Sequence, residues 1–123
     1  MLKLLLDEHI SPRVAKGMHR RHRALVVHWM AEWNSGDYLG KDDSVCLLRA
    51  ATERLTLVTY DRRTIPPLLK DWAEQGRRHA GIIFVDEKSI APAAIGGLVR
   101  ALSYLYRHSG KWDWTDRVCF LQG

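Results

Sequence analysis

The 123-residue chain has no long apolar run, no internal repeat and no low-complexity tract. A helix that crosses a membrane needs roughly 20 consecutive apolar residues, and no such segment occurs. The apolar stretch at residues 4–6 is too short for the core of a secretory signal peptide, and acids follow it at once. These absences predict one soluble domain, residues 1–123, that stays in the cytoplasm.

Cysteine is also scarce. Cys46 and Cys119 are the only two, each lies among apolar residues, and they form no Cys-x-x-Cys pair. We therefore expect two buried free thiols rather than a metal or redox site.

Acidic residues are missing between Glu8 and Glu32, although the chain as a whole has 14 of them against 19 Lys and Arg. The gap is filled by basic residues and histidines: Arg13, Lys16, Arg20, Arg21, Arg23, His19, His22 and His28. A local positive field of this kind suits a polyanion. A solvated helix face followed by a turn accounts for the same composition equally well.

Short apolar segments alternate with helical ones along the whole chain. We predict strands at residues 2–6, 24–29, 55–60, 81–87 and 117–121. We predict helices at residues 11–21, 44–54, 64–76 and 91–108. This alternation is typical of an α/β fold with a mainly parallel sheet covered on both faces.

Local signals mark where these helices begin and end. Ser11 is a candidate N-cap, and Pro12 suits the first helical position. Asp42 or Asp43 can cap the second helix and Thr64 the third. Gly76 is a candidate stop for the third helix.

Acids follow the predicted strands. Asp7 comes directly after the first strand, Asp61 after the third and Asp86 at the end of the fourth, while Asp42 and Asp43 open a helix. In parallel sheets the carboxyl ends of the strands and the starts of the helices meet at one edge, where ligands bind. We therefore expect these acids to converge.

Converging carboxylates repel unless protons or cations separate them. Mg²⁺ or Mn²⁺ suits hard oxygen ligands, and such an ion can activate water and stabilise the oxygens of a phosphoryl displacement. Basic residues around such a pocket would hold phosphates, so the pattern is typical of a nuclease. The candidate phosphate-binding residues are Arg13, Lys16, Arg20, Arg21, Arg62 and Arg63.

The chain resembles the small PIN-like proteins of prokaryotes, which are related to the toxins of toxin–antitoxin pairs. The resemblance covers about residues 2–86 and is carried by LLLDEHISPRVA, KDDSVCLLRAA, LVTYDRRT and GIIFV, in this order. It implies a three-layer α/β/α sandwich and an endoribonuclease site that uses Mg²⁺ or Mn²⁺. It also implies a small antitoxin protein as a partner.

The resemblance assigns roles to individual residues. Asp7 matches the first family acid, Asp42 or Asp43 the acid that leads a helix, and Asp61 the third acid. Thr59 matches a hydroxyl that supports the third acid. Asp86 is in the place of a fourth acid, which PIN-like relatives often lack.

Several of these residues also suit purely structural roles. Glu8 is a candidate supporting or capping residue, and His9 either orients a carboxylate, contacts RNA or bonds within a turn. The aspartates are also ordinary cap and turn residues. Arg13, Arg62 or Arg63 could neutralise Asp7 in a salt-bridge cluster without any metal.

Three functions follow from these alternatives. The first is a metal-dependent ribonuclease of the PIN-like toxin type. The second is a PIN-like module that binds RNA or protein and does not cut. The third is a phosphate-handling protein of response-regulator type, which the absence of a lysine after a late strand disfavours. Trp112 and Trp114 alternate with polar residues and are expected to cover a sheet edge or to form a homodimer interface.

Overall fold

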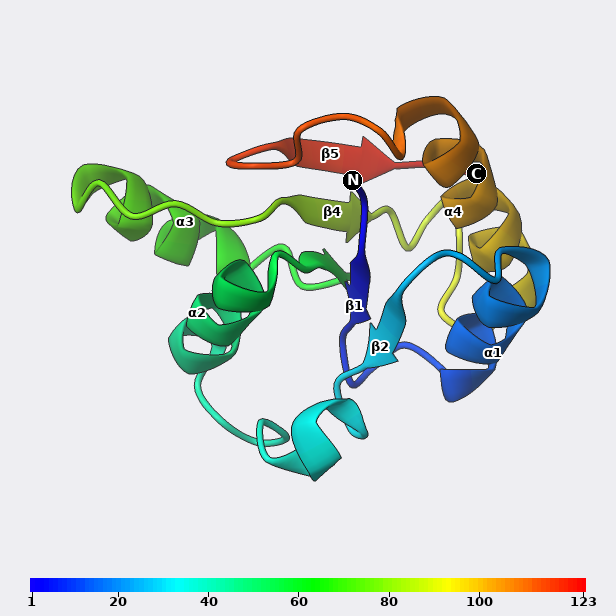
Figure 1. The fold of residues 1–123 in the computed structure, drawn as a ribbon, viewed down its shortest axis with the longest axis horizontal. Helices are drawn as coiled ribbons and strands as arrows, with labels where there is room; N and C mark the ends of the chain where they lie inside the picture. Colours follow the sequence, from blue (N-terminus) through cyan, green and yellow to red (C-terminus); the bar gives the residue numbers. More distant parts are fainter.

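The computed structural model describes residues 1–123 and has an α/β architecture around a five-stranded, all-parallel sheet (Figure 1). The strands are β1 (Leu4–Leu6), β2 (Val27–Trp29), β3 (Thr56–Thr59), β4 (Ile82–Val85) and β5 (Val118–Leu121). Their order across the sheet is β2-β1-β3-β4-β5. The predicted α/β class with a parallel sheet is therefore confirmed.

Four α-helices cover the two faces of the sheet: α1 (Pro12–Arg21), α2 (Asp43–Glu53), α3 (Ile65–Glu74) and α4 (Ile95–Ser109). A short 3-10 helix, η1 (Trp33–Gly36), follows β2. In Figure 1, α1 and α4 lie on one side of the sheet, and α2 and α3 lie on the other. The arrangement is that of a three-layer α/β/α fold.

The alternation of side chains along the strands produces two separate cores. Leu4 and Leu6 of β1 join the core beneath α1 and α4, whereas Leu5 joins the core beneath α2 and α3. Trp72 of α3 is 2% exposed in this second core. Each helix layer is thus held to the sheet by its own apolar cluster.

The predicted cap of the first helix is present, whereas Asp42 and Thr64 occupy the N-cap positions of α2 and α3 without a side-chain capping bond. Ser11 Oγ accepts a hydrogen bond from the Arg13 N–H, and Val14, Ala15 and Met18 are the buried residues of α1. The final helix begins at Ile95 instead of residue 91, because the Ala94 N–H bonds to the Ala91 carbonyl in a preceding turn. The strands are shorter than predicted, since β1 and β2 pair only through the last three residues of the predicted segments, and β3 and β4 only through inner residues.

The order of strands reverses between β1 and β3. The chain passes from β1 outward to β2, then returns across β1 to β3 and continues to β4 and β5. In open α/β sheets such a switch point is the usual place for a ligand, beyond the carboxyl ends of the strands. The residues that follow β1 and β3 therefore occupy the position where a site is expected first.

Two further predictions concern the free thiols and the absence of a membrane-spanning segment. Both thiols are free, Cys46 buried and Cys119 half-buried. None of the four helices has the length and apolar character needed to span a membrane.

Candidate functional site

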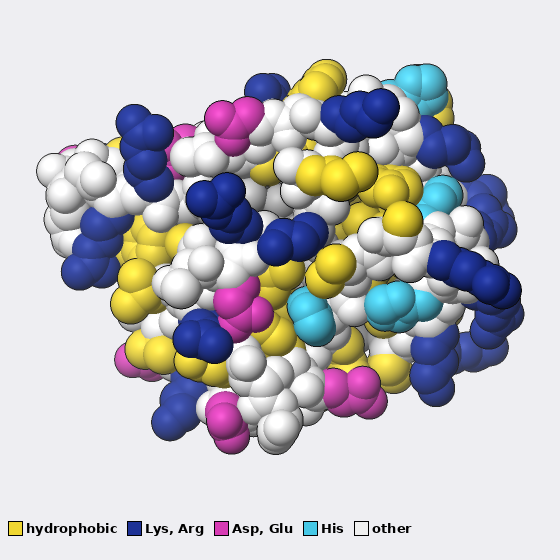
Figure 2. Space-filling view, viewed as in Figure 1, with side chains coloured by type: hydrophobic (Ala, Val, Ile, Leu, Met, Phe, Trp, Pro, Cys, Tyr) yellow, Lys and Arg dark blue, Asp and Glu magenta, His cyan; other side chains and the backbone are white.

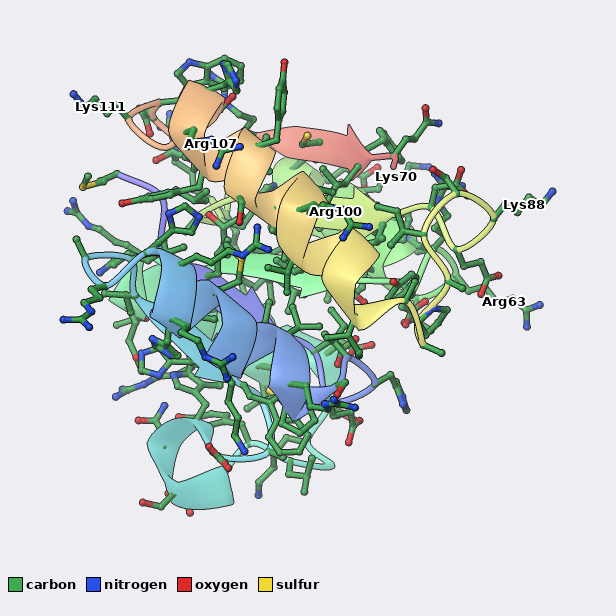
Figure 3. The ribbon with its side chains drawn as sticks, turned by 90° about the vertical axis from the view of Figure 1, so that its right-hand side faces the viewer. Arg63, Lys70, Lys88, Arg100, Arg107 and Lys111 are labelled. Carbon is green, nitrogen blue, oxygen red and sulfur yellow. The ribbon has the colours of Figure 1, made fainter.

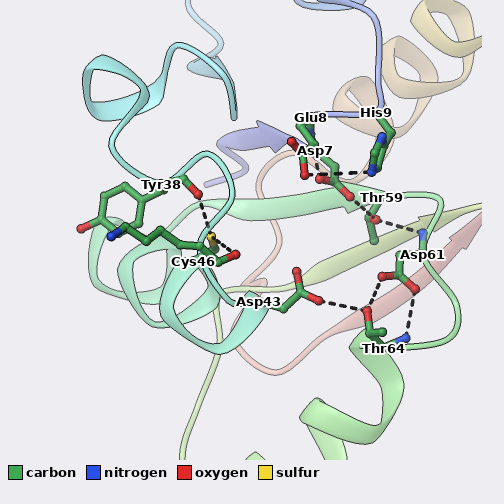
Figure 4. A network of polar contacts seen from close by, with 10 residues as sticks. Asp7, Glu8, His9, Tyr38, Asp43, Cys46, Thr59, Asp61 and Thr64 are labelled. Atoms are coloured by element: carbon green, nitrogen blue, oxygen red, sulfur yellow. Dashed lines mark hydrogen bonds and ion pairs between the residues drawn. The ribbon is translucent and has the colours of Figure 1, made fainter.

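Five side chains at the carboxyl ends of β1 and β3 form a connected set, which we call the acid network: Asp7, Asp43, Thr59, Asp61 and Thr64 (Figure 4). They come from the ends of two neighbouring strands, from the start of α2 and from the residue before α3. The sheet topology brings these distant parts of the sequence together at the switch point.

Thr59 joins the first and third acids. Its hydroxyl donates to Asp7 Oδ2 at 2.7 Å and accepts from the Asp61 N–H at 3.0 Å. The side chain is fully buried, and Asp7 Oδ1 accepts the Glu8 N–H at 2.7 Å. A hydroxyl that donates once and accepts once has a fixed orientation, so Thr59 holds the Asp7 carboxylate in one position.

The expected support from Thr59 therefore takes a different form. The Thr59 hydroxyl contacts the carboxylate of Asp7, and it reaches Asp61 only through the backbone N–H.

Asp61 closes the turn that leads into α3. Its Oδ1 accepts the Arg63 N–H at 2.8 Å and the Thr64 N–H at 3.0 Å, and its Oδ2 accepts the Thr64 hydroxyl. Burial opposes ionisation, but these hydrogen bonds outweigh it and lower the pKa of Asp61. Asp61 is therefore an anion at neutral pH.

Thr64 lies between two carboxylates. Its Oγ is 2.9 Å from Asp43 Oδ2 and also within hydrogen-bond distance of Asp61 Oδ2. A threonine hydroxyl carries one proton, so it can donate to only one of the two carboxylates at a time. At any moment, either Asp43 Oδ2 or Asp61 Oδ2 therefore faces the Thr64 oxygen without receiving its proton.

No lysine or arginine forms an ion pair with the network, although the charge of His9 contributes to the lowered pKa of Asp61. The three ion pairs of the structure are His9–Glu8, Arg49–Glu53 and Arg78–Asp116. Arg62 instead lies over the ring of Phe120, with its guanidinium carbon 5.2 Å from the ring centroid. A salt-bridge cluster of Asp7 with Arg13, Arg62 or Arg63 is therefore contradicted.

Asp42 and Asp86 stand outside the network. Asp42 occupies the N-cap position of α2, but its side chain makes no capping bond. Asp86 Oδ1 accepts the Lys88 N–H at 3.2 Å within its own turn at the end of β4. Of the two adjacent aspartates, Asp43 is the one that reaches the other acids.

Glu8 and His9 are exposed beside the network. His9 Nε2 lies 4.0 Å from Glu8 Oε1, and the His9 side chain is 81% exposed. Neither side chain forms a hydrogen bond with a carboxylate of the network. Their predicted supporting roles therefore stay predictions.

Cys46 of α2 lies close to the same carboxylates (Figure 4). Burial, followed by the nearby charges of Asp43 and Asp7, raises the pKa of the Cys46 thiol. The thiol therefore stays protonated and donates to the Tyr38 carbonyl at 3.4 Å. A neutral, bonded thiol of this kind is not a nucleophile.

The acid network fits a hard divalent cation in its chemistry. All its charged atoms are carboxylate oxygens, and these are the ligands that Mg²⁺ and Mn²⁺ prefer. The side chains as they stand form no group of three or more within reach of one ion. Mg²⁺ commonly uses one or two carboxylates and keeps several waters, so Asp43 and Asp61 suffice as a protein contribution.

The predicted phosphate-binding residues fall into two groups: Arg62 and Arg63 directly follow Asp61 of the acid network, whereas the other four lie on α1. Arg13 lies in the first turn of α1, and Arg13, Lys16, Arg20 and Arg21 are all exposed. This 10-residue helix carries Arg20 and Arg21 about 15 Å away from its start near the carboxyl edge. Figure 2 shows Lys and Arg side chains gathered along the side of the molecule where α1 lies.

Thr64 is the member of the network that the sequence does not single out as a site residue. The sequence predicts it only as a helix cap, yet its hydroxyl makes no capping bond and contacts Asp43 and Asp61 instead. The available signal is the spacing Asp61-x-x-Thr64, which is typical of a turn closed by an aspartate.

Comparisons with protein-family models, with curated proteins and with solved structures found no match to this chain.

Proposed function

We propose that the protein is a metal-dependent endoribonuclease of the PIN-like toxin type, with its site at the acid network. The observation that carries the proposal is the position of Thr64, whose single proton faces the carboxylates of both Asp43 and Asp61. Neither acid forms an ion pair with a lysine or arginine. Two neighbouring carboxylates without a Lys or Arg partner, at the switch point of a parallel sheet, suit an external cation.

The residues of the network would have distinct roles. Asp43 and Asp61 would hold Mg²⁺ or Mn²⁺, and Asp7, fixed by Thr59, would face the same space from the end of β1. The ion would supply an activated water and charge stabilisation for hydrolysis of a phosphodiester. Asp61 suits this task because its lowered pKa keeps it anionic well below neutral pH.

The test is cleavage of a varied RNA pool with and without Mn²⁺ by wild type and by Asp61→Asn. We expect the variant to lose orders of magnitude in cleavage rate and to bind RNA as tightly as wild type or more tightly, since a charge that repels phosphate is gone. Glu74→Gln, an exposed acid of α3, is the matched control and should be silent. If wild type, freed of any bound partner, leaves the pool uncut with Mn²⁺ present, the protein is a binding module and not a nuclease.

One observation favours a second candidate. The strand order β2-β1-β3-β4-β5 is that of the flavodoxin type, which response-regulator receivers share. In that case Asp61 would accept a phosphoryl group. The residue that directly follows β5 is Gln122 and not a lysine, which weighs against this function. Mass spectrometry after incubation with acetyl phosphate separates the two, because only a receiver gains a phosphoryl group on Asp61.

RNA, a small antitoxin protein and a second copy of the chain remain proposed partners. The first follows from the proposed reaction and the second from the resemblance to PIN-like toxins. Co-purification of a small protein with the untreated chain, followed by its removal, would test the antitoxin separately from the nuclease.

A further inference from the structure

The amino edge of the sheet, opposite the acid network, contains an open hollow of about 790 Å³. Its walls come from residues that precede the strands: Lys3 before β1, Val26 before β2, Arg54 before β3 and Ala80 before β4. The segment between α4 and β5 closes one side. We call this site the basic hollow, and its volume is in the range of small-molecule sites.

The charged side chains that line the basic hollow are mostly cationic. Lys3, Arg54, Arg78 and Lys111 line it, against a single acid, Asp113. Only Arg78 has an acidic partner, Asp116 at 3.8 Å, and that pair is largely exposed. Figure 3 shows Lys111 beyond the end of α4, on the opposite side of the molecule from Arg63 and Lys88. The hollow therefore attracts an anion.

Two tryptophans give the hollow a flat apolar wall. Trp114 is 5% exposed and is anchored by its Nε1–H, which donates to the Ser109 carbonyl at 3.0 Å. Trp112 stacks near it, with ring centroids 6.1 Å apart, yet remains 47% exposed. The guanidinium of Arg117 lies 4.6 Å from the centroid of Trp112 and braces it. An exposed ring held in this way can stack on a planar ligand.

His79 adds a nearly buried donor to the same wall. The residue is 8% exposed, and its Nδ1 accepts the Gly81 N–H at 3.0 Å. The neutral ring must therefore carry its proton on Nε2, which has no acceptor within the protein. This Nε2–H is open to water in the hollow, and an acceptor atom of a ligand can replace that water.

We propose that the basic hollow binds a nucleotide unit, with its base against Trp112 and its phosphate among Arg54, Arg78 and Lys111. The unit is either a free nucleotide or one nucleotide of a single strand, because both present a planar base beside a phosphate. The site does not depend on the acid network or on a metal, and it lies at the other edge of the sheet.

The experiment measures binding by titration calorimetry in EDTA, so that no metal-dependent cleavage interferes. The probes are AMP, a single-stranded oligonucleotide of six residues, ribose 5-phosphate and adenosine. We expect AMP or the oligonucleotide to bind, and the two partial probes to bind at least tenfold more weakly, because each lacks the base or the phosphate. A preference for AMP identifies a free nucleotide, and a preference for the oligonucleotide identifies a strand.

Variants test each wall of the hollow. Trp112→Ala should weaken binding about tenfold, and Trp112→Phe should restore most of it, since one stacked base contributes on this scale. The double variant Arg78→Gln/Lys111→Gln should weaken binding and reduce its salt dependence. The matched controls are Tyr104→Ala, an aromatic that is 60% exposed on α4, and the exposed pair Lys88→Gln/Arg100→Gln.

The controls should change the affinity less than twofold. If the test pair and the control pair weaken binding equally, the affinity comes from general attraction to a basic protein. That result would overturn the proposed site. An absence of binding by both AMP and the oligonucleotide at millimolar concentration would overturn it as well. Neither outcome bears on the proposed nuclease, which is assayed with metal and at the opposite edge.

Discussion

The carboxyl edge of the sheet gathers three carboxylates around two threonine hydroxyls, whereas the amino edge surrounds an open hollow with four cationic side chains. Part of this contrast follows from topology. Each helix α1 to α4 follows a parallel strand, so the helices begin near the carboxyl edge and end near the amino edge. Helix dipoles favour acids at the first edge and bases at the second.

The chain follows this rule at several helix ends. Asp43 opens α2, and the last turns of α1 and α4 carry His19, Arg20, Arg21, Arg107 and His108. Charge at either edge is therefore weak support for a ligand when taken alone. The informative feature is that these charges lack partners, since neither the network carboxylates nor most cations of the basic hollow form ion pairs.

Two threonines of β3 allow the edges to be compared within one strand. Thr59 donates to the Asp7 carboxylate, and Thr56, at the other end, donates to the Ala80 carbonyl at 2.8 Å. Both are buried. We expect Thr59→Val to lower the free energy of unfolding by about 2 kcal/mol and Thr56→Val by about 1 kcal/mol, because bonds to charged groups contribute more. Urea denaturation at neutral pH measures both.

The pair is its own control, since the two substitutions remove the same hydroxyl from the same strand. Equal losses would mean that the Asp7 carboxylate gains no more from its hydroxyl donor than a neutral carbonyl does. The contrast between a charged and a neutral edge would then have no energetic basis at these positions.

Asp42 and Asp43 provide a second comparison, with a smaller expected effect. Mn²⁺ at ten times its Kd would stabilise the folded protein by about 1.4 kcal/mol, which corresponds to a rise of a few degrees in Tm. Asp43→Asn should abolish this rise, because Asp43 reaches Thr64 and Asp61. Asp42→Asn should retain it, since the Asp42 side chain makes no capping bond and lies outside the network.

Thermal melting with and without millimolar Mn²⁺ distinguishes the two aspartates. Neighbouring aspartates at one helix start share the same dipole field, so a difference between them reports a specific ligand. A Tm that does not respond to Mn²⁺ in wild type would argue against the metal site. A response lost equally in both variants would assign the ion to the helix start in general.

The sequence predicts most of the fold because its signals are local. The apolar segments and the cap at Ser11 depend on neighbouring residues, and all five strands and four helices are present with shifted ends. The convergence of Asp7 and Asp61 also follows, since it needs only a parallel sheet and their places after two strands. The sequence does not predict the order of the strands across the sheet. That order places the switch point between β1 and β3, which Asp7 and Asp61 follow.

Other features depend on tertiary geometry that no local pattern encodes. The choice of Asp43 over Asp42 is set by the position of Thr64, 21 residues away. The basic hollow joins residues from Met1 to Thr115, and the sequence assigns Trp112 only to a sheet edge or a dimer interface. Part of the predicted basic rim is displaced, because the length of α1 carries Arg20 and Arg21 toward the other edge, while Arg62 and Arg63 directly follow Asp61.

The smallest expected effect is on the pH dependence of stability. The two edges of the sheet lose stability in different pH ranges. Burial, only partly offset by Asp116, lowers the pKa of His79 below its usual 6.5. The unfolded chain therefore binds this proton more readily, and stability is lost as the pH falls from above 6.5 through the lowered pKa. His22, at the same edge, has its pKa lowered by burial, Arg107 and Arg21, and it acts in the same window.

The carboxyl edge titrates in a more acidic window. The pKa of Asp61 is lowered from 3.8, so its contribution to stability is complete above that value and is lost only as the pH falls through the lowered pKa. Urea midpoints from pH 7 to pH 3 should fall first through the histidines and later through Asp61. His79→Gln should reduce the fall in the urea midpoint in the less acidic range, and Asp61→Asn should reduce the fall in the more acidic range. If His79→Gln tracks wild type between pH 7 and pH 5, the buried imidazole does not set the acid sensitivity of the amino edge, and His22 alone must carry it.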